Sequence, residues 1–273
     1  TSQQENSVAV VYVSGEISSD NSESYNQDWL LSTLDEIQAD PNNAAMLLVI
    51  DTPGGGVYEC DEIYQKILAY RKAGRPVYVS MAKYATSGGY YISAPCNKIY
   101  ANRNTITGSI GILSGTFLDV TGFLNQHGIR ATEIKSGKNK AMGSMLEPYT
   151  QEQLAIMQAV SNESYEQFLD VVATGRKMDK VALRRLADGR IYTARQALAN
   201  GLIDGIKTQD EVEAQMVADL KLPDASFYDY EYVPQFHWTD LLSMKSSTAE
   251  ELSAIVSTLT HSSMLPAYLA PIR

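Results

Sequence analysis

SMAKYATSGGYY, residues 80–91, follows a short apolar run at residues 77–80 and leads into an apolar segment with the spacing of a helix. The two glycines after Ser87 allow a tight turn, because a residue without a Cβ adopts backbone conformations that other residues avoid. A strand, a glycine turn and a helix in this order present a hydroxyl at the carboxyl end of a strand. If the chain is an enzyme, Ser87 is its candidate nucleophile.

A second unit of the same kind precedes this one. Residues 46–50 have the composition of a buried strand, DTPGGG at 51–56 is a turn, and residues 59–70 have helical spacing. Residues 8–13 form a further continuous apolar run that predicts a central strand. This repetition indicates a parallel sheet, in which sites gather at the carboxyl ends of the strands. We therefore expect both glycine turns at the same edge of the sheet.

The rest of the chain extends this pattern of strands and helices. The fold class that we expect is α/β, with a mostly parallel sheet, surrounding helices and a helical extension. It divides into a flexible N-terminus (1–7), an α/β domain (8–221) and a C-terminal strand, helix and extended tail (222–273). Further strands are predicted at residues 98–101, 110–113, 131–135 and 227–233, and helices at 29–37, 117–127, 150–173, 179–187, 193–200, 209–220 and 239–260.

Composition excludes several classes of function. A formal net charge of -10 argues against sequence-independent binding of nucleic acid, which needs a positive excess. The longest strongly apolar run, residues 44–50, is far shorter than the roughly 20 residues that span a bilayer. The chain begins at Thr1 without a methionine, which is consistent with removal of an anchor or signal. Two cysteines do not make a disulfide framework.

Ser87 needs a base, and the histidines are few. His127 lies at the end of a predicted helix, whereas His237 and His261 lie in the C-terminal segment. A Ser-His-Asp triad stays open as an alternative. Metal-ligand spacings are absent, and DTPGGG lacks the lysine and hydroxyl of a phosphate loop, so we expect neither a metal nor a cofactor.

Lysine is the other candidate base. A free lysine has a pKa of about 10.4, so a lysine base that works near neutral pH must lie in a dry pocket, where burial disfavours the ammonium. The glycine-flanked loop at residues 136–144 contains Lys138 and Lys140. Both lysines are candidates for the base. The alternative interpretation is that this loop is a solvated basic segment without a catalytic role.

Five motifs in order resemble the signal peptide peptidase A family, membrane-associated serine proteases of the Clp/crotonase superfold that use a Ser-Lys dyad. The resemblance covers roughly residues 8–215. Each motif alone is a weak signal, but five motifs in the right order are specific. The motifs are DTPGGG (51–56), ATSGGYY (85–91), TGSIG (107–111), KSGKNK (135–140) and DGRIYTARQA (188–197).

The resemblance implies a role for each site residue. Ser87 is the nucleophile, Lys140 the general base, and Ser109 the hydroxyl that orients the lysine amine. The oxyanion would be bound by backbone N–H groups of Gly88 and of Gly55 or Gly56.

Two positions depart from the family pattern without removing a catalytic group. Ala141 follows Lys140 where an acidic residue is common, and Thr86 replaces a smaller residue. The first departure keeps Lys138 open as the alternative base.

The function that the resemblance implies is a serine endopeptidase that degrades released signal peptides and other hydrophobic extended peptides. It also implies a homo-oligomeric ring such as an octamer, attached to a membrane through a segment absent from this chain. The catalytic domain would lie on the extracytoplasmic side of a bacterial cell membrane. The alternative is a non-proteolytic crotonase-superfold enzyme or an inactive scaffold. Residues that would line a substrate groove, or else belong to the core, are Val57, Tyr58, Tyr90, Tyr91, Ile112 and Leu113.

The C-terminal tail has the composition of a substrate for such a groove. Residues 264–271, MLPAYLAP, are apolar, extended in pattern and rich in small side chains. We expect this segment to act as a self-substrate or as a plug.

Overall fold

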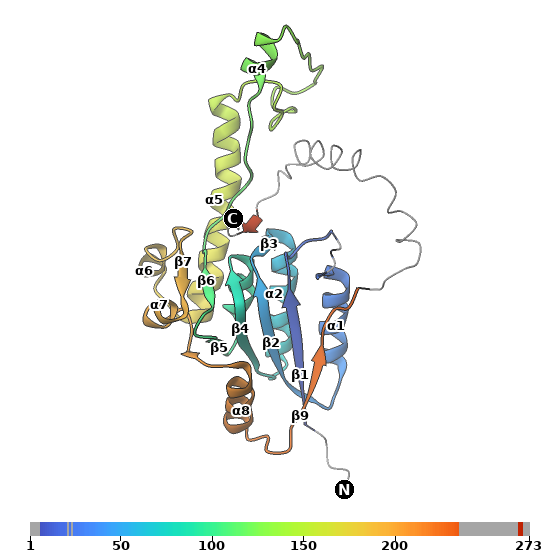
Figure 1. Ribbon diagram of the computed structural model, residues 1–273, viewed down its shortest axis with the longest axis vertical. Helices are drawn as coiled ribbons and strands as arrows, with labels where there is room; N and C mark the ends of the chain where they lie inside the picture. Colours follow the sequence, from blue (N-terminus) through green and yellow to red (C-terminus); the bar gives the residue numbers. More distant parts are fainter. Residues whose placement is uncertain (1–5, 21, 23, 235–266, 270–273) are drawn as a thin grey trace. The chain divides into compact units, whose positions relative to one another are not determined.

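The computed structural model describes residues 6–20, 22, 24–234 and 267–269 (Figure 1). The chain divides into two compact units. The sheet unit comprises the described residues within 1–112, 165–234 and 267–273, and the insertion unit comprises those within 113–164 and 235–266.

The sheet unit is built on one mostly parallel sheet, as the sequence predicts. Its strand order is β7-β6-β4-β2-β1-β9, with β5 paired to β4 and to β8. All of these pairs are parallel except β6 with β7. The strands are β1 (Ser7–Ser14), β2 (Asn43–Thr52), β4 (Val77–Thr86), β5 (Lys98–Ala101), β6 (Ile106–Gly108), β7 (Ile191–Thr193), β8 (Gly205–Ile206) and β9 (Ser226–Tyr230).

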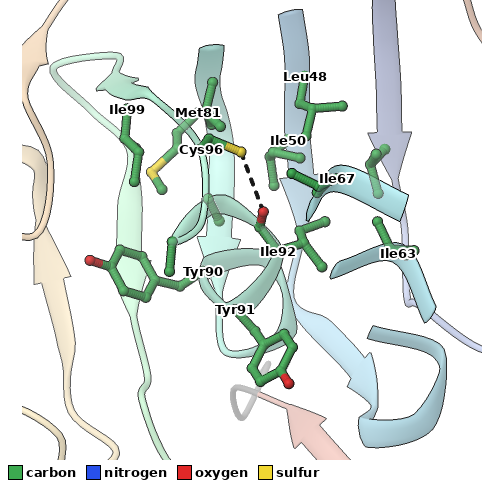
Figure 2. Packing of buried hydrophobic residues seen from close by; sticks show 14 of the residues in the cluster. Leu48, Ile50, Ile63, Ile67, Met81, Tyr90, Tyr91, Ile92, Cys96 and Ile99 are labelled. Atoms are coloured by element: carbon green, nitrogen blue, oxygen red, sulfur yellow. Dashed lines mark hydrogen bonds between the residues drawn. The ribbon is translucent and has the colours of Figure 1, made fainter. Parts of the chain in front are cut away.

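Both faces of the sheet are covered, which explains why its strands are continuous apolar runs rather than alternating ones. Ala9 and Val11 face one cluster of buried side chains, whereas Val8 and Val10 face another. The first cluster is formed with α1 (Gln27–Ala39), α2 (Val57–Lys72), α3 (Gly88–Ser93) and the end of α5 (Gln151–Arg176). The second is formed with α8 (Gln209–Leu220). Figure 2 shows the centre of the first cluster, where α3 packs against α2 and the sheet.

Helix ends follow the sequence signals closely. The Thr150 N–H donates to Gln153 Oε1 at 3.0 Å, and the Gln153 N–H donates to Thr150 Oγ1 at 3.1 Å. These two bonds form a capping box at the start of α5. The short helices α6 (Lys180–Arg184) and α7 (Ala194–Ala199) lie inside their predicted ranges.

Two strand predictions in the middle of the chain are wrong, and one helix is shorter than expected. The strand expected at 110–113 lies earlier, at β6, because Gly108 and Ser109 both have positive φ, 84° and 51°, and end the extended run. Residues 131–135 form no strand and are largely exposed, with Ile134 at 100%. The helix expected at 117–127 is present but shorter, as α4 (Thr121–Gln126), and Asp119 Oδ1 accepts the Thr121 N–H at 2.9 Å just before it.

Two strands lie in the C-terminal part of the described residues. The edge strand predicted at 227–233 is confirmed as β9, which pairs with β1 at the end of the strand order. A short strand, β10 (Ala267–Leu269), pairs antiparallel with β3 (Gly54–Gly56) (Figure 1). The helix expected at 239–260 lies outside the described residues. In the described part of the chain, no helix is long and apolar enough to cross a membrane.

Candidate active site

Three neighbouring strands end at the same edge of the sheet and bring the sequence motifs together. Strand β4 lies between β2 and β6, with Thr52 opposite Ala85 and Thr86 opposite Gly108. All three strands are parallel, so their carboxyl ends meet. The structure therefore confirms that the two glycine turns share one edge, and it adds the TGSIG segment to them.

Ser87 occupies a strained turn between β4 and α3. Its φ is 54° and its ψ is -114°, a conformation that costs a non-glycine residue on the order of 1–3 kcal/mol. The turn is held by the Ser87 N–H, which donates to the Gly108 carbonyl at 2.8 Å, and by the Tyr91 N–H, which donates to the Ser87 carbonyl at 2.9 Å. The Ser87 Oγ is buried and has no hydrogen-bond partner among the described residues. A strained backbone and an unpartnered hydroxyl at one residue are features of a reactive site.

Gly55 and Gly88 permit two backbone segments to approach each other beside Ser87. A Cβ on Gly88 would lie 3.1 Å from the Gly55 nitrogen and 2.5 Å from Cys60 Sγ. A Cβ on Gly55 would lie 1.8 Å from the Ile17 carbonyl oxygen. Glycine is therefore required at both positions for close packing of the main chain.

The N–H of Gly55, unlike that of Gly56, points away from Ile17. The Ile17 N–H donates to the Gly54 carbonyl at 2.9 Å, and the Gly56 N–H donates to the Ile17 carbonyl at 2.8 Å. Since main-chain groups alternate between the two sides of a strand, the N–H and C=O of Gly55 point to the opposite side. Of the two oxyanion donors expected from the sequence, the structure therefore favours Gly55.

A buried thiol lies next to this turn and is not a competing nucleophile. Cys60 is fully buried, and burial raises the pKa of its thiol well above the usual value, with smaller contributions from the charges of Glu59 and Asp61. The thiol is therefore protonated and poorly nucleophilic. Cys60 and Cys96 are both free.

Ser109 lies at the end of β6, next to Ser87. It is nearly buried, its φ is 51°, and its N–H donates to the Arg190 carbonyl at 2.8 Å. The preceding residue, Gly108, accepts the Ser87 N–H. The structure thus brings Ser87 and Ser109 to adjacent strand ends, as the motif order suggests.

A row of buried threonines connects the three strand ends. Thr107 Oγ1 donates to the Ala85 carbonyl at 2.7 Å, and Thr86 Oγ1 donates to the Pro53 carbonyl at 3.0 Å. Thr52 Oγ1 accepts the Gly54 N–H at 3.0 Å. The peptide between Pro53 and Gly54 is therefore held at both its carbonyl and its N–H. Thr86, which departs from the family pattern, thereby helps to fix the strand that contains Gly55.

We expect Thr86→Val to lower kcat by about tenfold to a hundredfold with little change in KM, somewhat less than the direct loss of an oxyanion donor. The substitution keeps the side-chain shape but leaves the Pro53 carbonyl without its donor, so the orientation of Gly55 becomes less fixed. Steady-state kinetics and thermal unfolding check this, with Thr86→Ser as the control that keeps the hydroxyl. Equal kcat values for the wild type and Thr86→Val would contradict the role assigned to the hydroxyl.

The two candidate lysines lie in the insertion unit, whereas Ser87 lies in the sheet unit. Lys138 Nζ donates to Glu152 Oε2 at 2.8 Å, and this bond lowers the pKa of the Glu152 carboxyl. The side chain of Lys140 is exposed and makes no hydrogen bond or ion pair with the described residues. Lys138 thus already has a carboxylate partner, whereas Lys140 has none among the described residues.

His127, the histidine within the described residues, also lies in the insertion unit. Its Nδ1 is 2.9 Å from the Phe123 carbonyl, and its ring packs on the Phe123 ring at 4.2 Å between centroids. His237 and His261 lie outside the described residues. The part of the chain that the structure describes contains no group of three or more His, Cys, Asp or Glu side chains able to hold a metal ion.

Two of the residues expected in a substrate groove belong to the core instead. Tyr90 and Tyr91 are fully buried (Figure 2), and their hydroxyls donate to the Leu202 carbonyl and to Asp61 Oδ1, each at 2.7 Å. Helix α3 places both rings inward because it packs between α2 and the sheet. Of the others, Val57 and Ile112 are half-buried, and Tyr58 and Leu113 are exposed.

A sequence profile described as Peptidase family S49 matches residues 69–222. The chain belongs to this family. The matched span contains Ser87, Ser109 and both candidate lysines, whereas the Gly54–Gly56 strand lies before it. The S49 assignment agrees with the mostly parallel α/β fold.

Three relatives illustrate the similarity. The chain is 39% identical over 222 residues to a protein of Enterococcus faecium named as a signal peptide peptidase SppA, covering 81% of this chain and 64% of that protein. It is 31% identical over 205 residues to a Methanocaldococcus jannaschii protein named as a protease, and the match covers 74% of this chain and 65% of that protein. It is 33% identical over 219 residues to Protease 4 of Salmonella typhi, where the match covers 79% of this chain and 35% of that protein. The chain thus spans between 35% and 65% of the length of these relatives.

Proposed function

We propose that the chain is a serine endopeptidase in which the Ser87 Oγ attacks the carbonyl carbon of a peptide bond. The observation that carries the proposal is the buried, unpartnered Ser87 hydroxyl on a strained turn beside the Gly55 N–H. Membership of peptidase family S49 supports it. In the first step the serine proton passes to a base and an acyl-enzyme forms as the amine leaves with that proton, and water then releases the acyl group.

Lys140 is the proposed base, and Ser109 the residue that orients it. A neutral lysine amine takes the proton of Ser87 and returns it to the leaving amine. Lys140 has no carboxylate partner among the described residues, in contrast to Lys138. Ser109 lies at the strand end next to Ser87, where its hydroxyl can meet an incoming amine.

The negative charge on the carbonyl oxygen is stabilised by main-chain donors. The N–H groups of Gly55 and Gly88 belong to two segments that approach each other beside Ser87. Two fixed N–H donors form an oxyanion hole, in which each donor is worth about 10²–10³ in kcat.

A fluorophosphonate probe tests the proposal directly, because it reacts only with an activated serine. We expect one adduct per chain, located at Ser87 by peptide mass spectrometry. Labelling at another residue would overturn the assignment. A labelled Ser87 without hydrolysis of any peptide would support the non-proteolytic alternative.

Self-association of this chain is part of the proposal. Most of the exposed large apolar side chains among the described residues lie in the insertion unit, including Phe123 at 62% and Ile134 at 100%. A large number of exposed apolar side chains in one unit supports an interaction site there. The exposed Lys140 also needs a drier environment to act as a base, and packing of copies in a ring such as an octamer supplies one.

We expect the double variant Phe123→Asp, Ile134→Asp to shift the protein to a smaller species and to lose most of its peptidase activity. Buried carboxylates are strongly unfavourable at an apolar interface. Sedimentation velocity and a peptide hydrolysis assay on the same samples check both effects. Val181→Asp, at a residue 67% exposed in the sheet unit, is the control and should change neither.

The proposed substrates are hydrophobic extended peptides such as released signal peptides. The Gly54–Gly56 strand carries no side chain that would obstruct a second strand, and it already pairs with β10. One relative carries the name of a signal peptide peptidase. We further propose that the protein acts on the extracytoplasmic side of a bacterial membrane, with its attachment outside the described residues.

A further inference from the structure

We propose that residues 188–192, DGRIY, form a clamp that holds Ser109 in the conformation in which it orients the lysine base. This inference rests on the proposed peptidase function, in which Ser109 has that orienting role. The clamp residues open the DGRIYTARQA motif, the one motif of the five that contributes no group to the proposed reaction. Asp188, Arg190 and Tyr192 are therefore positioning residues, which act on the reaction through Ser109.

Ser109 has a backbone conformation that a serine does not keep without support. It is nearly buried, and its φ is 51°. A positive φ is unfavourable for a residue with a Cβ, and it persists only where the surrounding structure enforces it. The direction of the Ser109 side chain therefore depends on what holds its main chain.

The clamp holds this main chain on both sides of the Ser109 side chain. The Ser109 N–H donates to the Arg190 carbonyl at 2.8 Å, and the Gly189 N–H donates to the Ile110 carbonyl at 3.0 Å. These two bonds continue the antiparallel pairing of β6 with β7 (Figure 1) beyond the end of β6 at Gly108. With the backbone fixed before and after its Cα, the Ser109 hydroxyl can move only between the rotamers of one side chain.

The side chains of Asp188 and Arg190 shape the clamp. The Arg190 N–H donates to Asp188 Oδ1 at 3.2 Å, and Arg190 Nε donates to the same oxygen at 2.7 Å. Gly189 between them has a φ of 86°, a conformation that glycine adopts without penalty. Hydrogen bonds from the Arg190 side chain lower the pKa of the Asp188 carboxyl to about 2, so it is ionised at neutral pH. The Asp188 carboxylate thus fixes Arg190, whose carbonyl holds Ser109.

Tyr192 packs against the residue that precedes Ser109. A Cβ on Gly108 would lie 2.5 Å from Tyr192 Cδ2, so the ring lies directly on the Gly108 main chain. The Tyr192 hydroxyl donates to the Leu186 carbonyl at 2.7 Å and keeps the ring in place. The Gly108 carbonyl in turn accepts the Ser87 N–H at 2.8 Å. The clamp therefore supports the bond that holds the nucleophile turn as well as Ser109.

Asp188→Ala tests the inference at an exposed side chain, where the substitution should not prevent folding. We expect kcat for peptide hydrolysis to fall about tenfold to a hundredfold with KM unchanged, because a displaced Ser109 misplaces the lysine amine and leaves substrate binding intact. Asp188→Asn should behave like the wild type, because an asparagine oxygen can also accept the Arg190 N–H.

The matched control is Glu166→Ala, which removes an exposed arginine–carboxylate pair with Arg184 and should not change kcat. An unchanged kcat in Asp188→Ala would overturn the inference. An equal fall of kcat in Asp188→Asn or in Glu166→Ala would overturn it as well.

The ring of Tyr192 is tested by a pair of variants. Tyr192→Phe keeps the ring on Gly108 and should retain the kcat of the wild type, whereas Tyr192→Ala should lower kcat with KM unchanged. The same kcat in the two variants would overturn the part assigned to the ring.

A double-mutant cycle shows whether the clamp acts through Ser109. In a Ser109→Ala chain, Asp188→Ala should lower kcat little further, because the hydroxyl that the clamp positions is already absent and the two effects are not additive. Equal fold-losses with and without the Ser109 hydroxyl would overturn the inference.

Hydrogen exchange separates failure of this inference from failure of the proposed function. The Ser109 N–H should exchange slowly in the wild type and faster in Asp188→Ala, as measured at single-residue resolution by NMR, because its bond to Arg190 opens more often. Unchanged exchange would overturn the inference, as would faster exchange with an unchanged kcat, and labelling of Ser87 would leave the peptidase standing in both cases. A wild type that neither reacts with a fluorophosphonate nor hydrolyses peptides would overturn the peptidase and the clamp's role in it, whereas faster exchange in Asp188→Ala would still establish the clamp as a feature of the fold.

Discussion

Ser87→Ala is expected to abolish fluorophosphonate labelling and to lower kcat for peptide hydrolysis by on the order of 10³–10⁶, the range seen when a serine nucleophile is removed. The cause is the loss of the oxygen that forms the acyl-enzyme. No loss of stability should accompany it, because the Ser87 hydroxyl is buried without a partner and its removal relieves an unsatisfied polar group. Intact-protein mass spectrometry, kinetics and thermal unfolding measure the three effects.

Ser93→Ala is the matched control, at a buried serine of the same helix. The Ser93 hydroxyl already donates to the Gly89 carbonyl at 2.6 Å. Its removal should cost about 0.5–1.5 kcal/mol of unfolding free energy and leave labelling of Ser87 intact. Retained labelling in Ser87→Ala would contradict the assignment of the nucleophile.

Lys140→Ala is expected to reduce kcat and the rate of Ser87 labelling by about a thousandfold or more, because the serine loses the base that removes its proton. Lys138→Ala should stay within a fewfold of the wild type, because the Lys138 ammonium is paired with Glu152. Lys140→Arg should be as inactive as Lys140→Ala, since a guanidinium does not lose its proton in proteins. Single-turnover labelling rates of the three variants provide the measurement.

The opposite ranking of the two lysines would transfer the role of base to Lys138. Activity that survives Lys140→Ala but is lost in His127→Ala would favour a histidine base instead. Sedimentation of each variant shows whether its assembly is intact, so that a loss of activity is assigned to chemistry and not to dissociation.

Local sequence patterns were sufficient to predict the framework that carries Ser87. The apolar runs that became β1, β2 and β4 are buried on both faces, and a run of this kind has few other stable conformations in a chain of this length. Helix α8 begins and ends where its pattern predicts. The common edge of the glycine turns followed because carboxyl ends of parallel strands meet at one edge.

Residues beyond that framework were harder to predict because their environment comes from distant parts of the chain. Tyr90 and Tyr91 follow Ser87 directly, yet their hydroxyls are bonded to Leu202 and Asp61. Residues 131–135 have the composition of a strand, but no neighbouring strand pairs with them among the described residues.

The sequence by itself determined that Ser87 lies on a tight turn after a buried strand, since strand, glycine and helix signals are properties of adjacent residues. Tertiary structure decided which groups surround that hydroxyl. The Ile17 carbonyl accepts the N–H of Gly56 and not that of Gly55, and Gly55 lies opposite Tyr268, which is more than 200 residues away in the chain. Hydrogen-bond partners of this kind depend on register and packing between distant segments, and no local pattern encodes them.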